Sequence, residues 1–580
     1  MRRAIATWRV AGRVAARPRR GARATGSSVR GVRPALAMLL CALLGLVAAG
    51  RTAWAQAPPA PAPSAPRAPG ALPEVVGGRL RVGLNESVRL AIRNNLDVEL
   101  ATIGPLVAGA ELGAAWGAYD PELFGEGGYT STETPTGSQL FFDVSGRRSY
   151  LNQRIWDGEA GLRGLIPWLG GAYSVSYAGS ELETNSPIET FSPNYGASFL
   201  ASLQIPLLRG LFWSEPWTAV RLARVGLDTS IEQVRADVMD IVRATEDAYW
   251  ALIAAREGRR VAQKSLETAQ ALLEQTRAQY EVGVVSKVEV VQAEAGVADR
   301  EFNLIRLDAQ ERTARDAFID VVLGPYLAPD SEIIVELEDP PEEIPVREVD
   351  PELATERAFA NRPEIALARK AIESSEIQLR FASNQRLPQL DVIGTYGNTG
   401  LAGELNPRCG LFGPCTRPPG YGDDWPDADR DFFSDEKAES FSVRGVLSIP
   451  IGNVRARNDY ERARLELRRA QLQLQRLQQS IVSDIRRAAR NLRAALEGIE
   501  AADRAVAAAE EQLRAERVRL EYGESTPFDV LQREEDLVTA ENQRILAQQT
   551  YHNAITELER AQGTILERNA IVIDHRGALR

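Results

Sequence analysis

The chain repeats itself, and this internal repeat constrains its fold more than any other feature. Residues 96–129 align without gaps on residues 363–396. Two further matches follow in the same order, which are Leu203–Pro206 with Leu447–Pro450 and Glu281–Gly283 with Glu521–Gly523. Matches in one order predict a supersecondary unit that is used twice. We therefore expect each half to contain a helix, strands, a very long helix, a glycine turn and a shorter helix.

The repeat and the local composition predict six segments. They are a signal peptide at 1–55, a disordered Pro/Ala-rich linker at 56–79, a first repeat at 80–330 with strands at about 121–206 and helices at about 216–323, an equatorial connector at 331–350, a second repeat at 351–567 with strands at about 388–450 and helices at about 454–566, and a C-terminal tail at 568–580.

The first segment has the pattern of a secretory signal. Residues 1–34 hold ten arginines and no acidic residue, residues 35–50 are apolar and small, and Ala53-Trp54-Ala55 is a small-x-small cleavage pattern. This apolar run is shorter than the roughly 20 residues that a spanning helix needs. Because no later run of about 18 apolar residues is apparent, we expect no transmembrane helix in the mature chain.

The charge balance argues against an anionic partner. The net charge is −11, and it becomes −22 without residues 1–55, which hold eleven arginines and no acidic residue. Such an acidic chain disfavours nucleic acid and anionic lipid, and it favours cations inside any pore that it forms.

Several segments alternate apolar and polar residues with the period of two that is typical of a strand. The clearest are Phe199–Ile205, Phe441–Ile449 and Tyr173–Tyr177. About nine residues of this pattern suit a strand that crosses a membrane, although a soluble sandwich would have the same alternation. The aromatic residues placed for an interfacial girdle are Tyr129, Tyr173, Tyr177, Phe199, Tyr396 and Phe441.

The helices are unusually long. Residues 216–282 and 454–522 hold no proline beyond the first position and each predict one helix of roughly 100 Å, with shorter helices at 287–323 and 527–566. Spacings that alternate three and four predict coiled-coil seams. The seam residues are Leu266, Ala269, Leu273, Thr276 and Tyr280, and then Leu492, Ala495, Ile499, Ala502, Val506, Ala509 and Leu513.

The turns between long and short helices are alike. Gly283 and Gly523 are expected to end the long helices, since glycine adopts a positive φ at little cost. Ser286 and Thr526 then cap the short helices. The acids three residues later, Glu289 and Asp529, suit the first turn of a helix. Capping explains both acids but not why the two turns resemble each other.

These features together resemble the TolC-like outer membrane efflux proteins. The motifs that carry the resemblance are the tip turns Val282-Gly283-x-x-Ser286-x-x-Glu289-Val290 and Gly523-x-x-Thr526-x-x-Asp529-Val530-Leu531, the strand exits Gln204–Leu207 and Ser448–Ile451, and the opening Leu84–Ala91 with Asn94-Asn95 after it. The resemblance covers nearly all of residues 80–566.

The resemblance implies an α+β membrane protein. It implies a homotrimer in which each protomer gives four strands to a shared 12-stranded β-barrel, continued by a long α-helical coiled-coil barrel. It further implies a site in outer-membrane lipid, a periplasmic adaptor protein, and an inner-membrane RND or ABC transporter, in an efflux pump or a type I secretion system. Neither a cofactor nor a metal is expected.

The resemblance also assigns residues. It implies that the tips at Gly283, Ser286, Gly523 and Thr526 contact the adaptor, and that Glu289 and Asp529 match acidic positions of the pore constriction. Three neighbouring positions depart from the best-known pattern, since Leu520, Ser525 and Gln532 stand in place of a gating tyrosine, an arginine and a second pore aspartate.

Two local features are specific to this chain. The span from Pro121 to Pro206 exceeds that from Pro388 to Pro450 by 23 residues, which predicts an extra hairpin around 158–180 whose position stays open. Cys409 and Cys415 lie in a Gly/Pro-rich stretch, where an exported protein is expected to form a local disulfide rather than keep two free thiols.

Three other functions fit the sequence less well. Catalysis has little support, since the two histidines, His552 and His575, lie in no nucleophile or metal pattern. A periplasmic adaptor would have one helical hairpin between soluble β domains, whereas two are expected here. A structural coiled-coil envelope protein would not need the paired strand segments.

Overall fold

The computed structural model describes residues 79–136, 150–324, 333–339, 349–410, 414–433 and 438–574. The chain divides into two units, residues 1–59 and 60–580, and every described residue lies in the second. The expected signal peptide and all of the expected linker except Arg79 therefore lie outside the described residues, as do the tail from 575 onward and His575.

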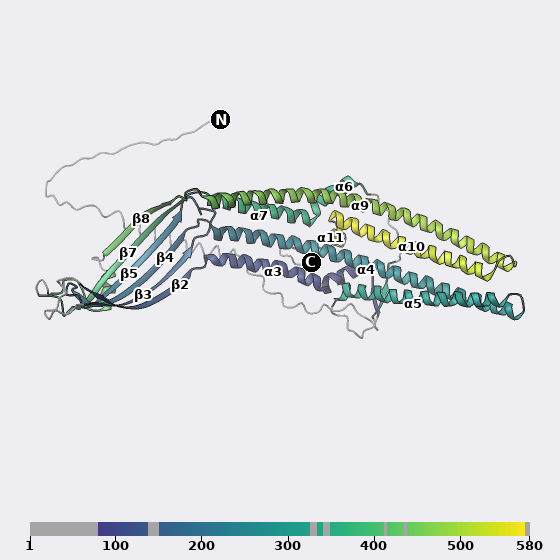
Figure 1. The fold of residues 1–580 in the computed structure, drawn as a ribbon, viewed down its shortest axis with the longest axis horizontal. Helices are drawn as coiled ribbons and strands as arrows, with labels where there is room; N and C mark the ends of the chain where they lie inside the picture. Colours follow the sequence, from purple (N-terminus) through teal and green to yellow (C-terminus); the bar gives the residue numbers. More distant parts are fainter. Residues whose placement is uncertain are drawn as a thin grey trace, which may run out of the picture. The chain divides into compact units, whose positions relative to one another are not determined.

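One antiparallel sheet holds six long strands in the order β2-β3-β4-β5-β7-β8 (Figure 1). Its strands are β2 (Glu122–Pro135), β3 (Tyr150–Leu165), β4 (Ala172–Thr184), β5 (Phe191–Pro206), β7 (Gln389–Leu405) and β8 (Ala438–Ser448). The expectation of four strands per protomer is therefore wrong. The surplus residues at 158–180 belong to β3 and β4, which lie in the middle of the sheet because β2 pairs with β3 and β4 pairs with β5.

The register gives the sheet one apolar and one polar face. Tyr177 lies opposite Phe199, and Tyr396 lies opposite Phe441, so these aromatic side chains share a face. On the other face hydroxyl groups meet across strands. The Oγ atoms of Ser174 and Ser202 are 2.8 Å apart, and those of Thr395 and Ser442 are 2.7 Å apart.

The helices form a wall beside the end of the sheet. Next to the sheet the neighbours are α3-α4-α7-α9, and farther away they are α5-α4-α10-α9 (Figure 1). Their bounds are α2 (Leu84–Asn94), α3 (Leu96–Trp116), α4 (Glu215–Glu281), α5 (Lys287–Leu323), α6 (Pro351–Asn361), α7 (Pro363–Gln385), α9 (Val454–Glu521), α10 (Pro527–Gln562) and α11 (Ile565–Arg568). The predicted long helices at 216–282 and 454–522 correspond to α4 and α9.

The expected seam of α9 is confirmed, because all seven of its residues from Leu492 to Leu513 are buried. The expected seam of α4 is confirmed only in part, because Ala269 and Thr276 are buried as expected and its other three residues are not. Leu266 and Leu273 are only partly buried and Tyr280 is 45% exposed, whereas Ser265 and Leu272 are buried. Helix α4 is rotated slightly, so that Ser265 and Leu272 complete its buried stripe together with Ala269 and Thr276.

A short parallel pair, β1 (Arg79–Val82) and β6 (Ile334–Leu337), lies near the middle of the helical wall. There each half has a glycine after its shorter helix. Gly324 follows α5 and Gly563 follows α10, both with positive φ. A Cβ on Gly324 would lie 3.2 Å from the carbonyl oxygen of Asn94, and one on Gly563 would lie 2.8 Å from the backbone of Asn361. Both glycines thus allow a helix end to meet the turn between two helices.

A buried carboxylate fixes the C-terminal segment against this middle region. Glu246 of α4 is fully buried. It accepts hydrogen bonds from Thr556 Oγ1 at 2.5 Å and from Asn569 Nδ2 at 3.2 Å, and it pairs with Arg568 of α11. Because a buried charge is tolerated only when it is paired and hydrogen-bonded, this cluster holds α4, α10 and α11 in one arrangement.

Helix α3 bears on the expectation that the mature chain has no transmembrane helix. The segment Leu96–Tyr119 is long and apolar enough to cross a membrane by length and composition, although one such helix is weak evidence for a span. Its apolar residues are largely exposed, for example Leu100 at 65% and Val107 at 51%. The helix packs on α4 and leads directly into β2, which favours a role at the edge of the wall.

The connection between β7 and β8 folds back onto the apolar face of the sheet. Helix α8 (Trp425–Phe433) contacts β7 and β5, and the ring of Trp425 lies over Gly179. Cys409 and Cys415 in this connection form a disulfide with Cα atoms 5.9 Å apart.

Candidate functional site: hairpin tips and lateral edges

The α4–α5 tip is a tight glycine turn. Helix α4 ends at Glu281, and Gly283 adopts a φ of 79°. Ser286 caps α5. The Glu289 carboxylate accepts hydrogen bonds from the backbone N–H of Ser286 at 3.3 Å and from the Oγ of Ser286 at 3.1 Å. The capping box therefore occupies the Glu289 carboxylate within its own turn. Val282 and Val284 are 75% and 72% exposed, so the tip offers an apolar surface.

The α9–α10 tip has the same build. Gly523 adopts a φ of 72°, and Asp529 accepts from the Thr526 N–H at 3.1 Å and from its Oγ1 at 2.7 Å. These hydrogen bonds from Thr526 hold the pKa of Asp529 below its ordinary value. Asp529 is therefore charged at neutral pH. Tyr522, which directly precedes Gly523 in the turn, is 79% exposed.

The two tips belong to one packed unit. Behind the turns, Leu531 of α10 lies against Gly296 of α5, where a Cβ would come within 3.0 Å of its side chain. Arg300 of α5 donates to the Leu531 carbonyl oxygen at 2.9 Å. The apolar cluster that surrounds this contact contains Ala269, Leu272, Val297, Leu513, Val530 and Leu531. The four sequence-predicted tip residues and both acids lie beyond this cluster, at the free ends.

Two ion pairs near the tips were missed from the sequence. Arg277 of α4 lies 2.7 Å from Glu294 of α5, and Arg517 of α9 lies 2.8 Å from Glu534 of α10. Within each pair the two residues are 17 positions apart in the sequence. Each residue of the second pair follows its counterpart in the first pair by 240 positions. That is the offset of the tip turns, so extending the repeat alignment would have revealed them.

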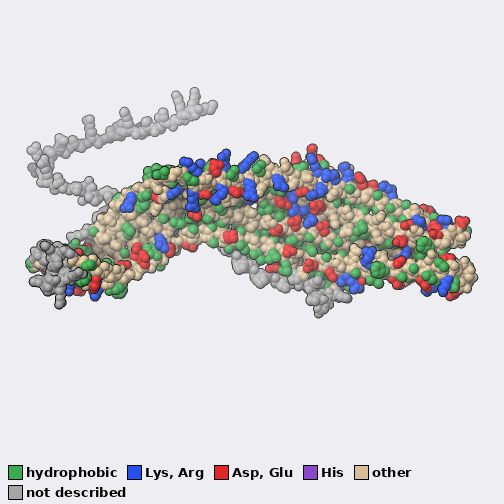
Figure 2. Space-filling view, in the orientation of Figure 1, with side chains coloured by type: hydrophobic (Ala, Val, Ile, Leu, Met, Phe, Trp, Pro, Cys, Tyr) green, Lys and Arg blue, Asp and Glu red, His purple; other side chains and the backbone are tan. Residues whose placement is uncertain are grey.

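The helical wall has two open lateral edges with unlike charge. Helix α3 carries three acidic and no basic side chains, whereas residues 454–476 of α9 carry seven arginines and three acids. Basic side chains line the upper edge in Figure 2, which α9 forms. The strands at the same edges are β2 and β8, and β8 is exposed along its whole length. Large apolar residues also lie exposed there, with Leu100 on α3, Phe302 on α5 and Leu465 on α9.

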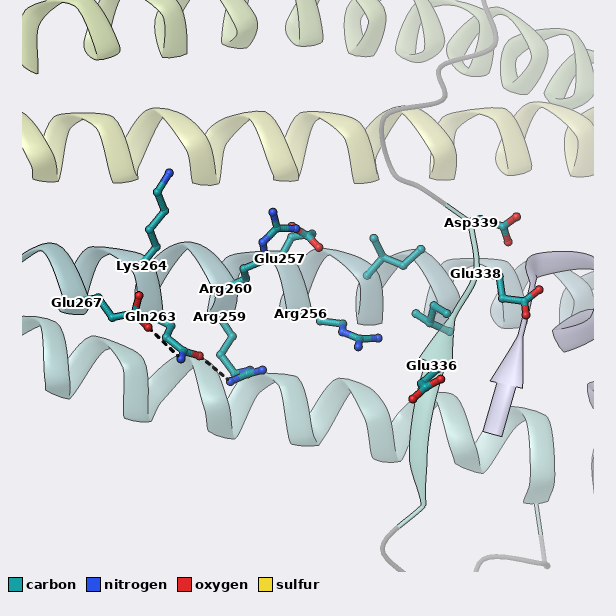
Figure 3. A pocket seen from close by; sticks show the side chains of 12 residues that line it. Arg256, Glu257, Arg259, Arg260, Gln263, Lys264, Glu267, Glu336, Glu338 and Asp339 are labelled. Atoms are coloured by element: carbon teal, nitrogen blue, oxygen red, sulfur yellow. Dashed lines mark hydrogen bonds and ion pairs between the residues drawn. The ribbon is translucent and has the colours of Figure 1, made fainter. Parts of the chain in front are cut away.

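A charged hollow of about 790 Å³ lies between α4 and β6 (Figure 3). Its side chains include Arg256, Arg260 and Lys264 from α4, with Glu336 and Glu338 from the β6 segment. Within the hollow Arg260 pairs with Glu257 at 3.2 Å, and Gln263 donates to Glu267 at 3.3 Å. The lining holds no histidine, cysteine or serine, and it therefore lacks the common nucleophiles.

His552, which the sequence left without a role, is packed inside the wall. Its ring stacks on Trp250 with centroids 3.5 Å apart, and it is 7% exposed. Among the described residues no group of three or more His, Cys, Asp or Glu is placed to hold a metal ion.

An amphipathic sheet joined to a wall of long helical hairpins defines a class of bacterial outer-membrane channel proteins, and three solved members have this fold. CmeC of Campylobacter jejuni is 17% identical with a TM-score of 0.57, over 83% of this chain and 85% of that chain. VceC of Vibrio cholerae is 16% identical with a TM-score of 0.55, and the match covers 83% of this chain and 96% of VceC. The open state of MtrE from Neisseria gonorrhoeae is 16% identical with a TM-score of 0.53, and the match covers 83% of this chain and 88% of MtrE.

The family model for the outer membrane efflux protein matches residues 160–321 and 354–564. The chain belongs to the outer membrane efflux protein family. No curated protein sequence matches it. As a member of this family it is an outer-membrane protein whose helical part lies in the periplasm.

Proposed function

We propose that this chain is the subunit of a homotrimeric outer-membrane channel that receives substrates from an inner-membrane RND or ABC transporter through a periplasmic adaptor. The channel serves a tripartite efflux pump or a type I secretion system. Family membership favours this function over that of an adaptor or a structural coiled coil.

The open lateral edges carry the proposal. In lipid the backbone groups of an edge strand must be paired, which for a sheet requires closure. The edge made by β2 and α3 is acidic and apolar, and the edge made by β8 and α9 is basic and apolar. Two different, complementary edges give a head-to-tail contact, which generates a ring when the rotation between neighbouring copies closes. A ring of copies would surround one continuous passage.

We further propose that the chain arose by internal duplication. The element order of each half, the paired ion pairs Arg277–Glu294 and Arg517–Glu534, and the paired glycines Gly324 and Gly563 support it. Two similar hairpins per subunit would give a ring of similar tips, which suits an adaptor that binds all around the ring.

The exposed tips are the proposed adaptor contact. Gly283, Ser286, Gly523 and Thr526 shape two turns whose apolar side chains, such as Val284, have no partner among the described residues that would bury them. Glu289 and Asp529 lie just behind these turns, and a ring of such acids would constrict the pore or bind cations.

The test is made on the full chain in the outer membrane. The protein should require detergent for extraction, have three times the mass of the mature chain by native mass spectrometry, and dissociate on heating in SDS. It should also conduct ions in a planar bilayer. A chain that is released without detergent, or that is monomeric and does not conduct, contradicts the proposal.

A further inference from the structure

The six-stranded sheet is as wide as the wall of helices beside it. Six strands about 4.8 Å apart, tilted by about 40°, span about 38 Å. Four helices about 8–10 Å apart span about 32–40 Å, and α3, α4, α7 and α9 are four helices in a row at the end of the sheet. Four strands would span only about 25 Å. Because of the hairpin β3–β4, the sheet has about the same width as the row of four helices, whereas a four-stranded sheet would be narrower than that row.

The hairpin is an integral part of the sheet. β3 pairs with β2 over 14 residue pairs and with β4 over 13, and β4 pairs with β5 over 11. A closed ring that keeps these pairings must therefore contain six strands from every copy.

We propose that three copies close an eighteen-stranded barrel, and that this channel passes hydrophilic macromolecules such as polypeptide chains rather than small solutes alone. The proposal rests on the homotrimer proposed above. At equal tilt, eighteen strands separate opposite backbones by about 36 Å, against about 24 Å for twelve. The barrel is then no narrower than the helical tube that feeds it.

The polar face of the sheet fits such a passage. Where α8 leaves the apolar face uncovered, that face lies against lipid, and the opposite face lines the lumen. It carries hydroxyl groups that hydrogen-bond across strands, namely Ser174 with Ser202 and Thr395 with Ser442. Near the periplasmic end the charge of Glu122 is neutralised by Arg163 at 2.7 Å. Small hydroxyls narrow the lumen little, and Glu126, Asp157 and Glu159 share this face by the register, so the lumen is hydrophilic and acidic.

The sheet allows a clean test of the hairpin. β2 ends and β5 begins at the outer end of the sheet, away from the helices, and β3 and β4 run from that end and back to it. Deleting residues 150–184 therefore leaves β2 and β5 antiparallel and still connected at the outer end. The variant has four strands per chain and would close a twelve-stranded ring as a trimer.

Access to the lumen can be measured with single cysteines on neighbouring residues. Ser202 of β5 lies on the polar face, and Ala201 lies on the apolar face. Ser202→Cys and Ala201→Cys are made in the full chain and in the variant that lacks 150–184. The native Cys409 and Cys415 are joined in a disulfide, so they add no background without reductant. Maleimide-linked polyethylene glycols of graded mass are then added from outside to intact cells.

We expect Ser202→Cys to react in both chains, with a mass cut-off at least twofold larger in the full chain, because polymer size grows more slowly than polymer mass. Ala201→Cys should not react in either. An equal cut-off in the two chains overturns the wide barrel while leaving the channel proposal intact. A mass other than that of a trimer, or equal reactivity of the two cysteines, overturns the proposed function itself.

Should the shortened variant fail to assemble, a cryo-EM map of the full chain in nanodiscs decides the matter. Eighteen strands in the ring support the proposal, and any other number overturns it.

Discussion

The guanidinium of Arg517 lies 2.8 Å from the carboxylate of Glu534 and ties α9 to α10 just behind the tip. In the first half Arg277 and Glu294 make the same connection at 2.7 Å. The two pairs differ in burial, because the Glu534 side chain is 6% exposed and that of Glu294 is 47% exposed. The same contact therefore has different surroundings in the two hairpins.

This difference gives the first prediction. Glu534→Gln should loosen the α9–α10 tip, because Arg517 loses its charge-assisted hydrogen bond with the buried carboxylate of Glu534, at a cost of about 1–2 kcal/mol. Glu294→Gln is the matched control and should cost less than about 0.5 kcal/mol, as exposed pairs do. Hydrogen exchange of the tip amides should accelerate about tenfold in the first variant and little in the second. Equal acceleration would show that burial does not set the strength of these pairs.

The sequence predicted the helices well and the sheet only in part. Long proline-free stretches and the glycine turns define α4, α5, α9 and α10, since helix signals are local in the chain. The number of strands depends on which strands pair, which is a non-local property. The surplus at 158–180 showed that a hairpin exists, but its place in the sheet is set by the pairing of β2 with β3 and of β4 with β5.

The site was predicted unevenly for a similar reason. Caps such as Thr526–Asp529 follow from four consecutive residues and are present. The rotation of α4, which buries Ser265 and Leu272 rather than Leu266 and Leu273, depends on the shape of the neighbouring helix. The contact of Trp425 with Gly179 joins residues 246 positions apart, and no local signal announces it.

The second prediction separates the two roles of Asp529. Asp529→Ala removes the acceptor that caps α10, at about 1 kcal/mol of local stability. Asp529→Asn keeps a side-chain oxygen at the same place and removes only the charge. Faster hydrogen exchange in the first turn of α10 is expected for the alanine variant alone. If the carboxylate also lies in the pore, both variants should show weaker block by divalent cations in planar bilayers.

The pH dependence of that block follows from the pKa of Asp529. Hydrogen bonds from Thr526 lower this pKa, so the charged form persists at neutral pH and is lost only as the pH falls below the ordinary value of 3.8. Block should therefore be constant from pH 8 to about pH 5. Unchanged block and conductance in both variants would remove Asp529 from the pore.

The third prediction concerns Asp247 of α4. Burial raises the pKa of this carboxyl to about 6; the charge of Arg243 opposes the rise, and Glu557 and Glu246 add to it. The folded state then binds the proton more tightly than the unfolded chain does, so stability falls as the pH rises from about 4 to 6. Asp247→Asn should raise the heat-dissociation temperature at pH 7.5 and leave it unchanged at pH 4.

Asp503 of α9, an exposed carboxylate, provides the control. Asp503→Asn should leave the dissociation temperature unchanged at both pH values. A stabilisation by Asp247→Asn that is equally large at pH 4 would mean that the charge of Asp247 is not its cause.

The last prediction tests the packing of α8 on the sheet. A Cβ on Gly179 would overlap the indole of Trp425, which also packs at a tilt against Tyr195 with ring centroids 5.8 Å apart. Gly179→Ala should displace the ring and lower stability by about 1–3 kcal/mol, as overpacking does. Gly394→Ala on the interior strand β7 is the control, because the nearest atom to its added methyl group is the Leu203 carbonyl oxygen at 4.0 Å and alanine suits a strand better than glycine. In a Trp425→Ala background the effect of Gly179→Ala on the heat-dissociation temperature should disappear. If the two effects simply add, Trp425 does not rest on Gly179 and α8 is held to the sheet by other contacts.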